Sequence, residues 1–530
     1  MRFPKNTLFS QFLLWYNLEN AAITEDRDML KRGYIKLMTE AEWLPVALLL
    51  CLGFALRLAA LTALPYGLNQ DEASAGYDAF ALLQSGVDRN GDSWPVLFVS
   101  WGSGQNVLMS CLAMPFIALF GLSEVTLRLP NAICGCLTLV VFWRLARRTR
   151  GKYFGVTALG LLALNPWHIM ASRWALESNL LPFFLLLGIW LTACAKADDH
   201  PWALLGAAAA FALSLYAYGA AFFFLPPFLI LAVVWLRKSI RQKPLPFVLA
   251  LLLFLLLAAP IAACQVINVF GLDEIRLFGV TLPRLTEGRQ IATSVFGGAN
   301  ALDNFSEFLK ILWTQSDGLI WNALPPRYGG IFYVFGLPTA AAGFIASLLA
   351  RKDRREEAPM RIALVCALVC AFLIRCNINR INMAWLPMIY FSAVGCHIIL
   401  AKLDSWAALP FTAMLACFVL FCSGYRDTFA ESRGGNVNFF PGLGDAIGYA
   451  ASLDAGPVYV TDRVNQPYIF ALFYTQTPPE VFINSVEYRD ENAAFRQVER
   501  FAGFEFDDPD RCAVRVLYRN GEYYVVQGAP

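Results

Sequence analysis

Asp71 and Glu72 form an adjacent pair of carboxylates a few residues after a long apolar segment, residues 44–64. At roughly 1.5 Å of rise per residue, a helix over that segment is long enough to cross a bilayer. A carboxylate at such a boundary is either part of a solvated surface or a general base, which removes the proton of a reacting hydroxyl. Ionisable groups beside a low-dielectric region mark functional sites by default, so we predict that the pair is catalytic.

Other polar residues are expected to gather on the same side of the membrane. A guanidinium group binds phosphate through two parallel hydrogen bonds, which suits an anionic lipid headgroup. The arginines predicted to bind phosphate are Arg128, Arg173, Arg327 and Arg380. The residues predicted to position substrates are Tyr77, Asp88, Gln105, Glu177 and Asn382. Each also has a structural interpretation, since a single external arginine is more often an anchor at the lipid surface, and Glu177 could simply pair with Arg173.

The composition is that of a polytopic helical membrane protein. Of the 530 residues, 58% are hydrophobic and only 15% are charged, whereas soluble domains carry roughly a quarter charged residues. The net charge of +2 is too small to suggest nucleic acid as a partner. The 13 cysteines mostly lie inside apolar runs, where cysteine behaves as a small hydrophobic residue, so a disulfide framework is not expected.

Eleven apolar segments are predicted to cross the membrane. They are residues 44–64, 129–147, 153–165, 180–197, 202–217, 220–237, 245–265, 328–350, 361–375, 381–402 and 407–424. Basic clusters at 144–152, 237–243 and 351–355 place the intervening loops in the cytoplasm by the positive-inside rule. This assignment is consistent only if the apolar stretch 105–121 is an interfacial helix that does not cross.

The resulting layout has three parts. Residues 1–42 form a cytoplasmic N-terminal segment, and residues 43–425 form a transmembrane domain with external loops at 65–128 and 266–327. Residues 436–530 are predicted to form a small extracytoplasmic α/β domain, because VYVTD at 458–462, VRVLY at 514–518 and YYVVQ at 523–527 have the pattern of strands.

The first external loop is predicted to begin with a short helix that lies on the membrane surface. Ala73, Tyr77, Phe80 and Ala81 recur at helical spacing, and Gly86 ends the run. Such a helix would start at the carboxylate pair and hold it near the lipid headgroups.

Nucleotide-binding motifs are missing from the sequence. It contains neither GxxxxGK[ST] nor a GxGxxG between a strand and a helix, so an enzyme here must draw its activated substrate from the membrane. Only three histidines are present, which argues against a histidine-rich metal site. No cofactor is expected to be required; a divalent metal held by carboxylates alone remains open but is not indicated.

The order of several motifs resembles the membrane glycosyltransferases of the C superfamily. The motifs are LNQDEASAGYDAF, SGVDRNGDSWP, GLSEVTLRLPNA, WRLARRTRGK and LNPWHIMASRWALES, followed by LPPRYGGIFYVFGLP, NINRINMAWLP and PYIFALFYTQTPP. The nearest branch is family thirty-nine, which includes protein O-mannosyltransferases and, nearby, the aminoarabinose transferases of lipid A. Related enzymes often carry a Pro-Pro or Lys-Pro-Pro element where this chain has Gly104, Gln105 and Asn106, so a phosphate-binding lysine is not carried over.

The resemblance implies an enzyme of the bacterial inner membrane with an extracytoplasmic active site. Such an enzyme transfers a sugar from a polyprenyl-phosphate donor to a hydroxyl of a glycan, lipid or protein acceptor, by a single displacement with inversion. Asp71 matches the first-loop aspartate taken as the base, and the transferred group is a hexose or a pentose.

Two other classes of function stay open on the sequence. A polymerase or ligase of lipid-linked glycans would differ in the length of its product. A flippase or transporter would show charged or broken spans near the bilayer midplane, for which Arg57 and the Pro226–Pro227 pair are the main candidates.

Overall fold

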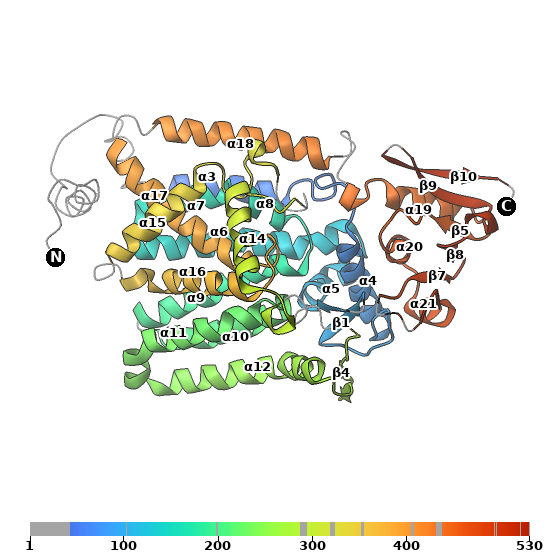
Figure 1. Ribbon diagram of the computed structural model, residues 1–530, viewed down its shortest axis with the longest axis horizontal. Coiled ribbons are helices and arrows are strands. Elements are labelled where there is room, and N and C mark those ends of the chain that lie inside the picture. Colours follow the sequence, from blue (N-terminus) through green and yellow to red (C-terminus); the bar gives the residue numbers. More distant parts are fainter. Residues whose placement is uncertain are drawn as a thin grey trace.

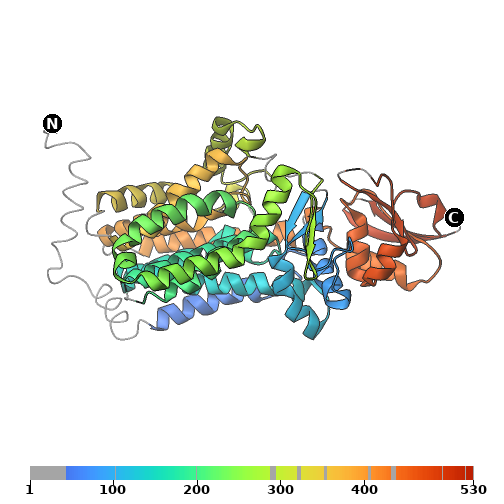
Figure 2. The same ribbon diagram turned by 90° about the horizontal axis from the view of Figure 1, so that it is seen from below.

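The computed structural model describes residues 43–101, 103–197, 200–286, 294–318, 324–350, 355–403, 408–430, 437–491, 493, 495–519 and 521–528. The segment 1–42, predicted to be cytoplasmic, lies outside the described residues. Figures 1 and 2 show a bundle of long helices at one end and an α/β domain at the other, with α4, α5 and a short hairpin between them.

Each of the eleven predicted apolar segments contains a helix. These helices are α3 (Trp43–Leu58), α6 (Glu124–Arg150), α7 (Lys152–Ala163), α9 (Leu181–Ala197), α10 (Ala203–Ala217), α11 (Ala221–Gln242), α12 (Pro244–Phe270), α15 (Gly336–Leu349), α16 (Ala358–Leu373), α17 (Trp385–Leu403) and α18 (Ala408–Phe429). Within the described residues, five helices are long and apolar enough to cross a membrane, or six if α7 and α8 (Pro166–Ser172) form one bent span. The polytopic helical character is therefore confirmed, whereas the count of eleven spans stays a prediction.

Helices α7 and α8 meet at an angle of 61°. Asn165 caps the N-terminus of α8 by accepting a hydrogen bond from the His168 amide, and Pro166 occupies the first turn, where a missing N–H costs nothing. The buried Arg57 of α3 donates to the carbonyls of Leu162 and Ala163 at the C-terminal end of α7, where carbonyls lack the helical N–H four residues on. Arg57 therefore stabilises the bend, which accounts for a charge inside an apolar segment.

Helix α6 joins the two ends of the molecule. Its first residue, Glu124, accepts a hydrogen bond from the Tyr474 hydroxyl of the α/β domain, at 2.7 Å. Its last turn carries Arg147, Arg148 and Arg150. The basic cluster therefore lies at the opposite end of the bundle from the α/β domain.

The segment between the bundle and the α/β domain comprises α4 (Gln70–Ser85), β1 (Leu97–Ser100), β2 (Ser103–Asn106) and α5 (Leu108–Phe120). Strands β1 and β2 form an antiparallel hairpin. Helix α5 has 13 residues and is about 20 Å long. Helices α7, α10 and α15, which lie in predicted spans, are of similar length, so the interfacial position of 105–121 stays a prediction.

Helix α4 starts and ends where the sequence predicts, but it does not lie on a surface. It begins with a capping box of Asn69 and Glu72 and ends at Gly86, which has a φ of +72°. Every residue from Glu72 to Leu82 is buried. The prediction of an amphipathic surface helix is wrong, because α5 covers one side of α4 and the α/β domain covers the other; Ser110 donates to the Ala75 carbonyl and Tyr77 to that of Thr477.

The second long loop contains short elements. These are β3 (Ile275–Leu277), β4 (Val280–Leu282), the 3-10 turn η2 (Val295–Gly297), α14 (Ala301–Thr314) and the turn η3 (Pro326–Tyr328). Two further turns, η4 (Arg355–Glu357) and η5 (Asn382–Ala384), precede α16 and α17, and η1 (Glu177–Leu180) precedes α9.

The C-terminal part is an α/β domain. Its helical elements are η8 (Val437–Phe439), α19 (Leu443–Ser452), α20 (Pro467–Thr475), α21 (Pro479–Ser485) and η9 (Pro509–Arg511). Its strands are β5 (Val458–Val460), β6 (Glu487–Tyr488), β7 (Val498–Phe501), β8 (Phe504–Glu505), β9 (Val514–Arg519) and β10 (Glu522–Gln527), in the order β10-β9-β5-β8-β7-β6. Strand β5 runs parallel to both of its neighbours. Strands β5, β9 and β10 overlap the three stretches that the sequence identified as strands.

Candidate active site

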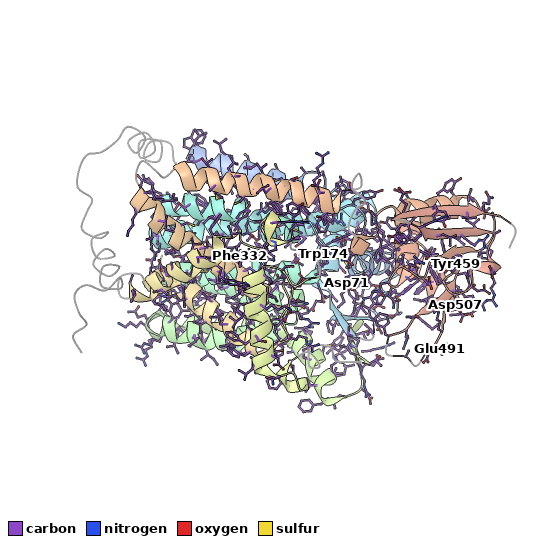
Figure 3. All side chains as sticks on the ribbon, turned by 45° about the horizontal axis from the view of Figure 1, so that its top comes forward. Asp71, Trp174, Phe332, Tyr459, Glu491 and Asp507 are labelled. Carbon is purple, nitrogen blue, oxygen red and sulfur yellow. The ribbon has the colours of Figure 1, made fainter. Side chains whose placement is uncertain are left out.

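Asp71 lies in the first turn of α4, at the boundary between the helical bundle and the α/β domain (Figure 3). It is half-buried, and its Oδ1 accepts a hydrogen bond from the indole Nε1 of Trp101 at 3.3 Å. Its backbone carbonyl accepts one from Gln105 Nε2 at 3.0 Å. The N-terminus of a helix carries a partial positive charge, which favours the ionised form of a carboxyl group there. An ionised carboxylate of this kind can act as a base.

A line of contacts extends from Asp71 to three other residues predicted from the sequence. Gln105 is followed on β2 by Asn106, whose backbone N–H donates to the carboxylate of Glu177 in η1. The next residue, Ser178, accepts at its carbonyl a hydrogen bond from Asn382 Nδ2 in η5, at 3.0 Å. We call the residues Asp71, Gln105, Asn106, Glu177, Ser178 and Asn382 the polar row.

Two atoms of the polar row have no hydrogen-bond partner among the described residues. They are the Ser178 hydroxyl and Asn382 Oδ1, and both residues are buried. Leaving a buried polar atom unpaired costs free energy, so such atoms are places where a ligand or a water molecule is expected to bind. The polar row therefore offers hydrogen-bonding capacity that the protein itself does not use.

Glu72 is turned away from Asp71 into a closed ion pair. Its Oε1 and Oε2 accept hydrogen bonds from Nε and Nη2 of Arg128 at 2.8 and 2.9 Å. The backbone amides of Ala175 and Asn69 also donate to this carboxylate. Both Glu72 and Arg128 are fully buried. A catalytic role for Glu72 is not supported by this geometry, because its oxygens have protein partners and do not reach solvent.

Arg128 has no free donor to offer to a phosphate. Besides Glu72, it donates to the carbonyls of Leu61, Pro65 and Gly67 at 2.5–2.8 Å. These bonds use all five of its N–H groups. The predicted contact of Arg128 with phosphate is therefore replaced by a structural role.

Arg173 likewise has a structural role. Its guanidinium group donates to the carbonyls of Leu56, Ala60 and Leu64, at and just beyond the C-terminal end of α3, over 2.7–2.9 Å. Carbonyls at a helix end need such partners, and a cation there also complements the helix dipole. We call Glu72, Arg128 and Arg173 the arginine anchor.

Arg380 and Arg327 are more accessible. Arg380 is half-buried and stands two residues before Asn382 of the polar row; its backbone N–H donates to Asn377. Arg327 is exposed, with its guanidinium carbon 4.9 Å from the centre of the Tyr328 ring. Of the four predicted phosphate-binding arginines, these two keep the accessibility that the role requires.

Tyr77 and Asp88 make hydrogen bonds that stabilise the structure, with partners outside the polar row. The Tyr77 hydroxyl donates to the Thr477 carbonyl and so ties α4 to the α/β domain. Asp88 is buried, and its Oδ1 accepts from the amides of Asn90 and Asp92, which shapes a turn. Burial, with the nearby charge of Asp78, raises the pKa of Asp88 to about 7. The prediction that both residues position substrates is not supported.

A buried arginine that is not among the predicted site residues lies beside the site. Arg89 pairs with Asp78 at 2.5 Å and donates to the hydroxyls of Ser74 and Ser100 at 2.5 and 2.6 Å. Both hydroxyls in turn donate to Oε1 of Gln105. A single arginine amid the acidic residues of this loop was the available signal. Arg89 thereby fixes the orientation of Gln105.

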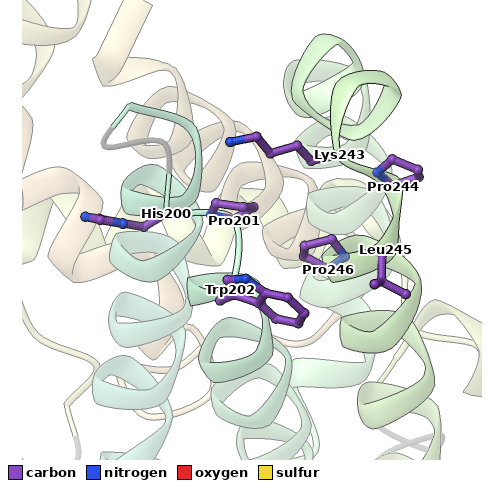
Figure 4. Close-up of a pocket in the computed structure, with 7 residues that line it drawn as sticks. All are labelled: His200, Pro201, Trp202, Lys243, Pro244, Leu245 and Pro246. Carbon is purple, nitrogen blue, oxygen red and sulfur yellow. The ribbon is translucent and has the colours of Figure 1, made fainter.

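A cavity of about 490 Å³ lies away from the polar row, between the α9–α10 and α11–α12 turns, as Figure 4 shows. Its lining residues are His200, Pro201, Trp202, Lys243, Pro244, Leu245 and Pro246. Asn106 contacts the other end of α10, at the Leu215 carbonyl, so a helix length separates this cavity from Asp71. In the part of the chain that the structure describes, no group of three or more His, Cys, Asp or Glu residues could hold a metal ion.

The sequence matches one family. The model of the dolichyl-phosphate-mannose-protein mannosyltransferase family matches residues 88–263, which is less than half of the chain. No curated protein matches the chain.

Solved structures share the fold. ArnT from Cupriavidus metallidurans in the apo state is 13% identical with a TM-score of 0.52, over 85% of each chain. The same protein bound to undecaprenyl phosphate is 15% identical with a TM-score of 0.50, over 82% of this chain and 84% of that one. The Archaeoglobus fulgidus oligosaccharyltransferase tethered to an acceptor peptide is 12% identical with a TM-score of 0.54; the match covers 83% of this chain but only 64% of the archaeal one. The fold that the resemblance implies is thus confirmed, and identities this low show the fold alone.

Proposed function

We propose that this protein transfers a sugar from a polyprenyl-phosphate donor to an acceptor hydroxyl at the extracytoplasmic face of a bacterial inner membrane. The observation that carries the proposal is Asp71, a half-buried carboxylate at a helix N-terminus, at the head of a polar row with unused hydrogen-bonding atoms. The fold and the family match support a glycosyltransferase. Undecaprenyl phosphate in an ArnT structure supports a lipid-linked donor.

The distribution of charge supports the extracytoplasmic location. The basic turn of α6 lies at the far end of the bundle from the α/β domain, and by the positive-inside rule that far end is cytoplasmic. Asp71 and the α/β domain would then both be outside. In this layout the eleven apolar helices act as spans, and α5 lies at the outer interface.

The proposed chemistry is a single displacement. The acceptor oxygen attacks the anomeric carbon while the bond from that carbon to the phosphate oxygen breaks, and the acceptor proton passes to Asp71. Polyprenyl phosphate leaves as a stable anion, so no strong acid is needed. The configuration at the anomeric carbon inverts. A positioned base contributes about 10²–10⁴-fold to the rate of such a step.

The departing phosphate needs a cation, and Arg380 is our first candidate. It is accessible and its loop leads directly into Asn382 of the polar row. Arg327, in η3 between α14 and α15, is the second. Electrostatic stabilisation of a leaving phosphate by guanidinium groups is commonly the largest single contribution to such catalysis. We propose that the α/β domain, which covers α4, binds or admits the acceptor.

The proposal is tested by incubating the purified protein with a panel of undecaprenyl-phosphate hexoses and pentoses. We expect release of free undecaprenyl phosphate from at least one donor, with the sugar recovered on water or on an added cell-envelope fraction. The Asp71→Asn protein is the matched control and should not release it. If no donor is consumed by the wild type, or if the control consumes it at the same rate, the proposal is wrong.

A further inference from the structure

Trp101 stands at the turn between β1 and β2 in an unusual conformation. Its φ is +53°, in the left-handed region that bulky side chains rarely adopt. Such a conformation persists only where the surroundings hold it, and it is commonest at functional sites. The reason for the strained turn therefore has to be sought in what the Trp101 side chain contacts.

Three groups from separate parts of the chain surround the indole ring. The guanidinium carbon of Arg89 lies 5.1 Å from the centre of the ring. Tyr468 of α20 meets it edge-on with ring centres 6.0 Å apart, and Phe495 is tilted against it at 6.1 Å. Arg89 is itself buried and held by Asp78. The ring is thus held jointly by the loop after α4 and by the α/β domain.

The polar edge of the same ring reaches Asp71. The indole Nε1–H donates to Asp71 Oδ1 at 3.3 Å. An indole N–H can only donate, so it complements a carboxylate that is ionised and disfavours one whose oxygen has to donate in turn. A donor fixed by three packed groups both orients the carboxylate and favours its charged form.

We propose that Trp101 is a positioning residue for Asp71, and that the α/β domain influences the reaction through the ring contacts of Tyr468 and Phe495. This inference rests on the proposed function, in which Asp71 is the base. It assigns the C-terminal domain a part in catalysis that does not require it to touch the reacting atoms.

Other charged or titratable groups near Asp71 also influence its protonation and have to stay constant in a test. On α4 the neighbouring Glu72 is paired with Arg128. The loop after α4 contributes Arg89 with Asp78, η1 contributes Glu177 at the far side of the hairpin, and α20 contributes the phenol of Tyr468. None of these is altered when only the indole N–H is removed.

The experiment removes that N–H and follows the protonation of Asp71. Trp101→Phe keeps an aromatic ring, and 3-benzothienylalanine at position 101 keeps the full shape of tryptophan with sulfur in place of N–H. Carbodiimide modifies protonated carboxyl groups, and mass spectrometry of the Asp71 peptide gives the extent of labelling at each pH. In both variants the labelling midpoint should rise by about one pH unit, because a hydrogen bond to the charged form is lost. The acid limb of the profile of kcat/KM against pH should rise with it.

Trp94→Phe is the matched control, since Trp94 lies just before β1, also has a positive φ, and has an exposed side chain. Its midpoint should equal that of the wild type. An unchanged midpoint in the benzothienylalanine protein would overturn the inference even if the enzyme is active. If the midpoint rises while no donor is consumed by the wild type, the contact with Asp71 is supported and the proposed function alone fails.

Discussion

Two regions of this molecule begin at neighbouring carboxylates and differ in what surrounds them. Glu72 points into the arginine anchor, where Arg128 and two backbone amides occupy its oxygens. Asp71 is half-buried, and its carboxylate accepts a hydrogen bond from Trp101. Its backbone carbonyl begins the polar row, whose far end holds two buried atoms without a partner among the described residues. Two adjacent carboxylates thus have different roles. The helix turn directs Glu72 into a structural ion pair and leaves Asp71 available for catalysis.

The comparison shows what the arginines of this fold do. Arg128 and Arg173 donate their hydrogen bonds to backbone carbonyls near the end of α3. These bonds fix the chain segment that leads into α4. A charge buried with its partners satisfied contributes to a fixed geometry and has nothing left for a ligand. Accessible arginines such as Arg380 are the ones that can respond to a substrate.

The largest expected effect concerns the arginine anchor. Arg128→Ala leaves the Glu72 carboxylate buried without its cation and three carbonyls without donors, which typically costs about 3–5 kcal/mol. We expect a large fall in the midpoint of thermal unfolding in detergent, or no folded protein. Arg327→Ala, at an exposed arginine, is the control and should melt as the wild type does. Normal melting of Arg128→Ala with weakened binding of the donor would return Arg128 to the substrate site.

A second prediction compares Glu72 with Asp88, a buried carboxylate that lacks such a pairing. Because the folded state raises the pKa of Asp88 to about 7, that state holds its proton more tightly than the unfolded chain does. The stability of the wild type should therefore fall between about pH 4 and pH 7. Asp88→Asn removes this dependence and should be more stable than the wild type at pH 8, by roughly 1–4 kcal/mol, with little difference at pH 4.

Thermal unfolding at the two pH values measures this effect. The exposed Asp454 provides the control, since Asp454→Asn should change stability equally at both. Equal stability of Asp88→Asn and the wild type at pH 8 would show that the folded state does not disfavour the charged form of Asp88.

A third prediction concerns phosphate binding by Arg380, beside the polar row. Arg380→Ala should weaken binding of undecaprenyl phosphate by about 1.5–3 kcal/mol if the charge-assisted hydrogen bonds are made. Arg380→Lys should restore part of the loss, because lysine keeps the charge without the fork. Calorimetric titration in detergent measures the affinity. Arg375→Ala changes an exposed arginine of the same loop and should have a smaller effect; equal losses at Arg375 and Arg380 would point to a general charge effect.

Much of the fold could be predicted from the sequence because membrane helices follow from apolar length. Each of the eleven apolar segments contains a helix, and the strands at 458–460, 514–519 and 522–527 follow from their β-branched pattern. The surface position of α4 could not be predicted this way. Its small and apolar residues suit a membrane surface and a protein interior equally well. Only the packing of α5 and α20 against the helix determines that it is buried.

The site was predictable in outline and not in its details. The polar row joins Asp71, Gln105, Glu177 and Asn382, four residues that residue type and position predict to be in the site. The direction in which a side chain points cannot be deduced from spacing, so the sequence predicts catalysis for Glu72 and phosphate binding for Arg128, although the two residues pair with each other. Trp101 and Arg89 gave too little signal, because an isolated aromatic residue or a loop arginine is ordinary until its neighbours are known.

The central claim is that Asp71 serves chemistry and Glu72 serves structure, and one paired measurement tests it most directly. Turnover of an accepted undecaprenyl-phosphate sugar and the midpoint of thermal unfolding are measured side by side for Asp71→Asn and Glu72→Gln. We predict that Asp71→Asn loses about 10²–10⁴-fold in turnover at an unchanged unfolding midpoint, whereas Glu72→Gln lowers the midpoint because it breaks a buried ion pair. An Asp71→Asn protein that keeps more than about a tenth of wild-type turnover would contradict the account, because the loss of a general base has to cost more than that.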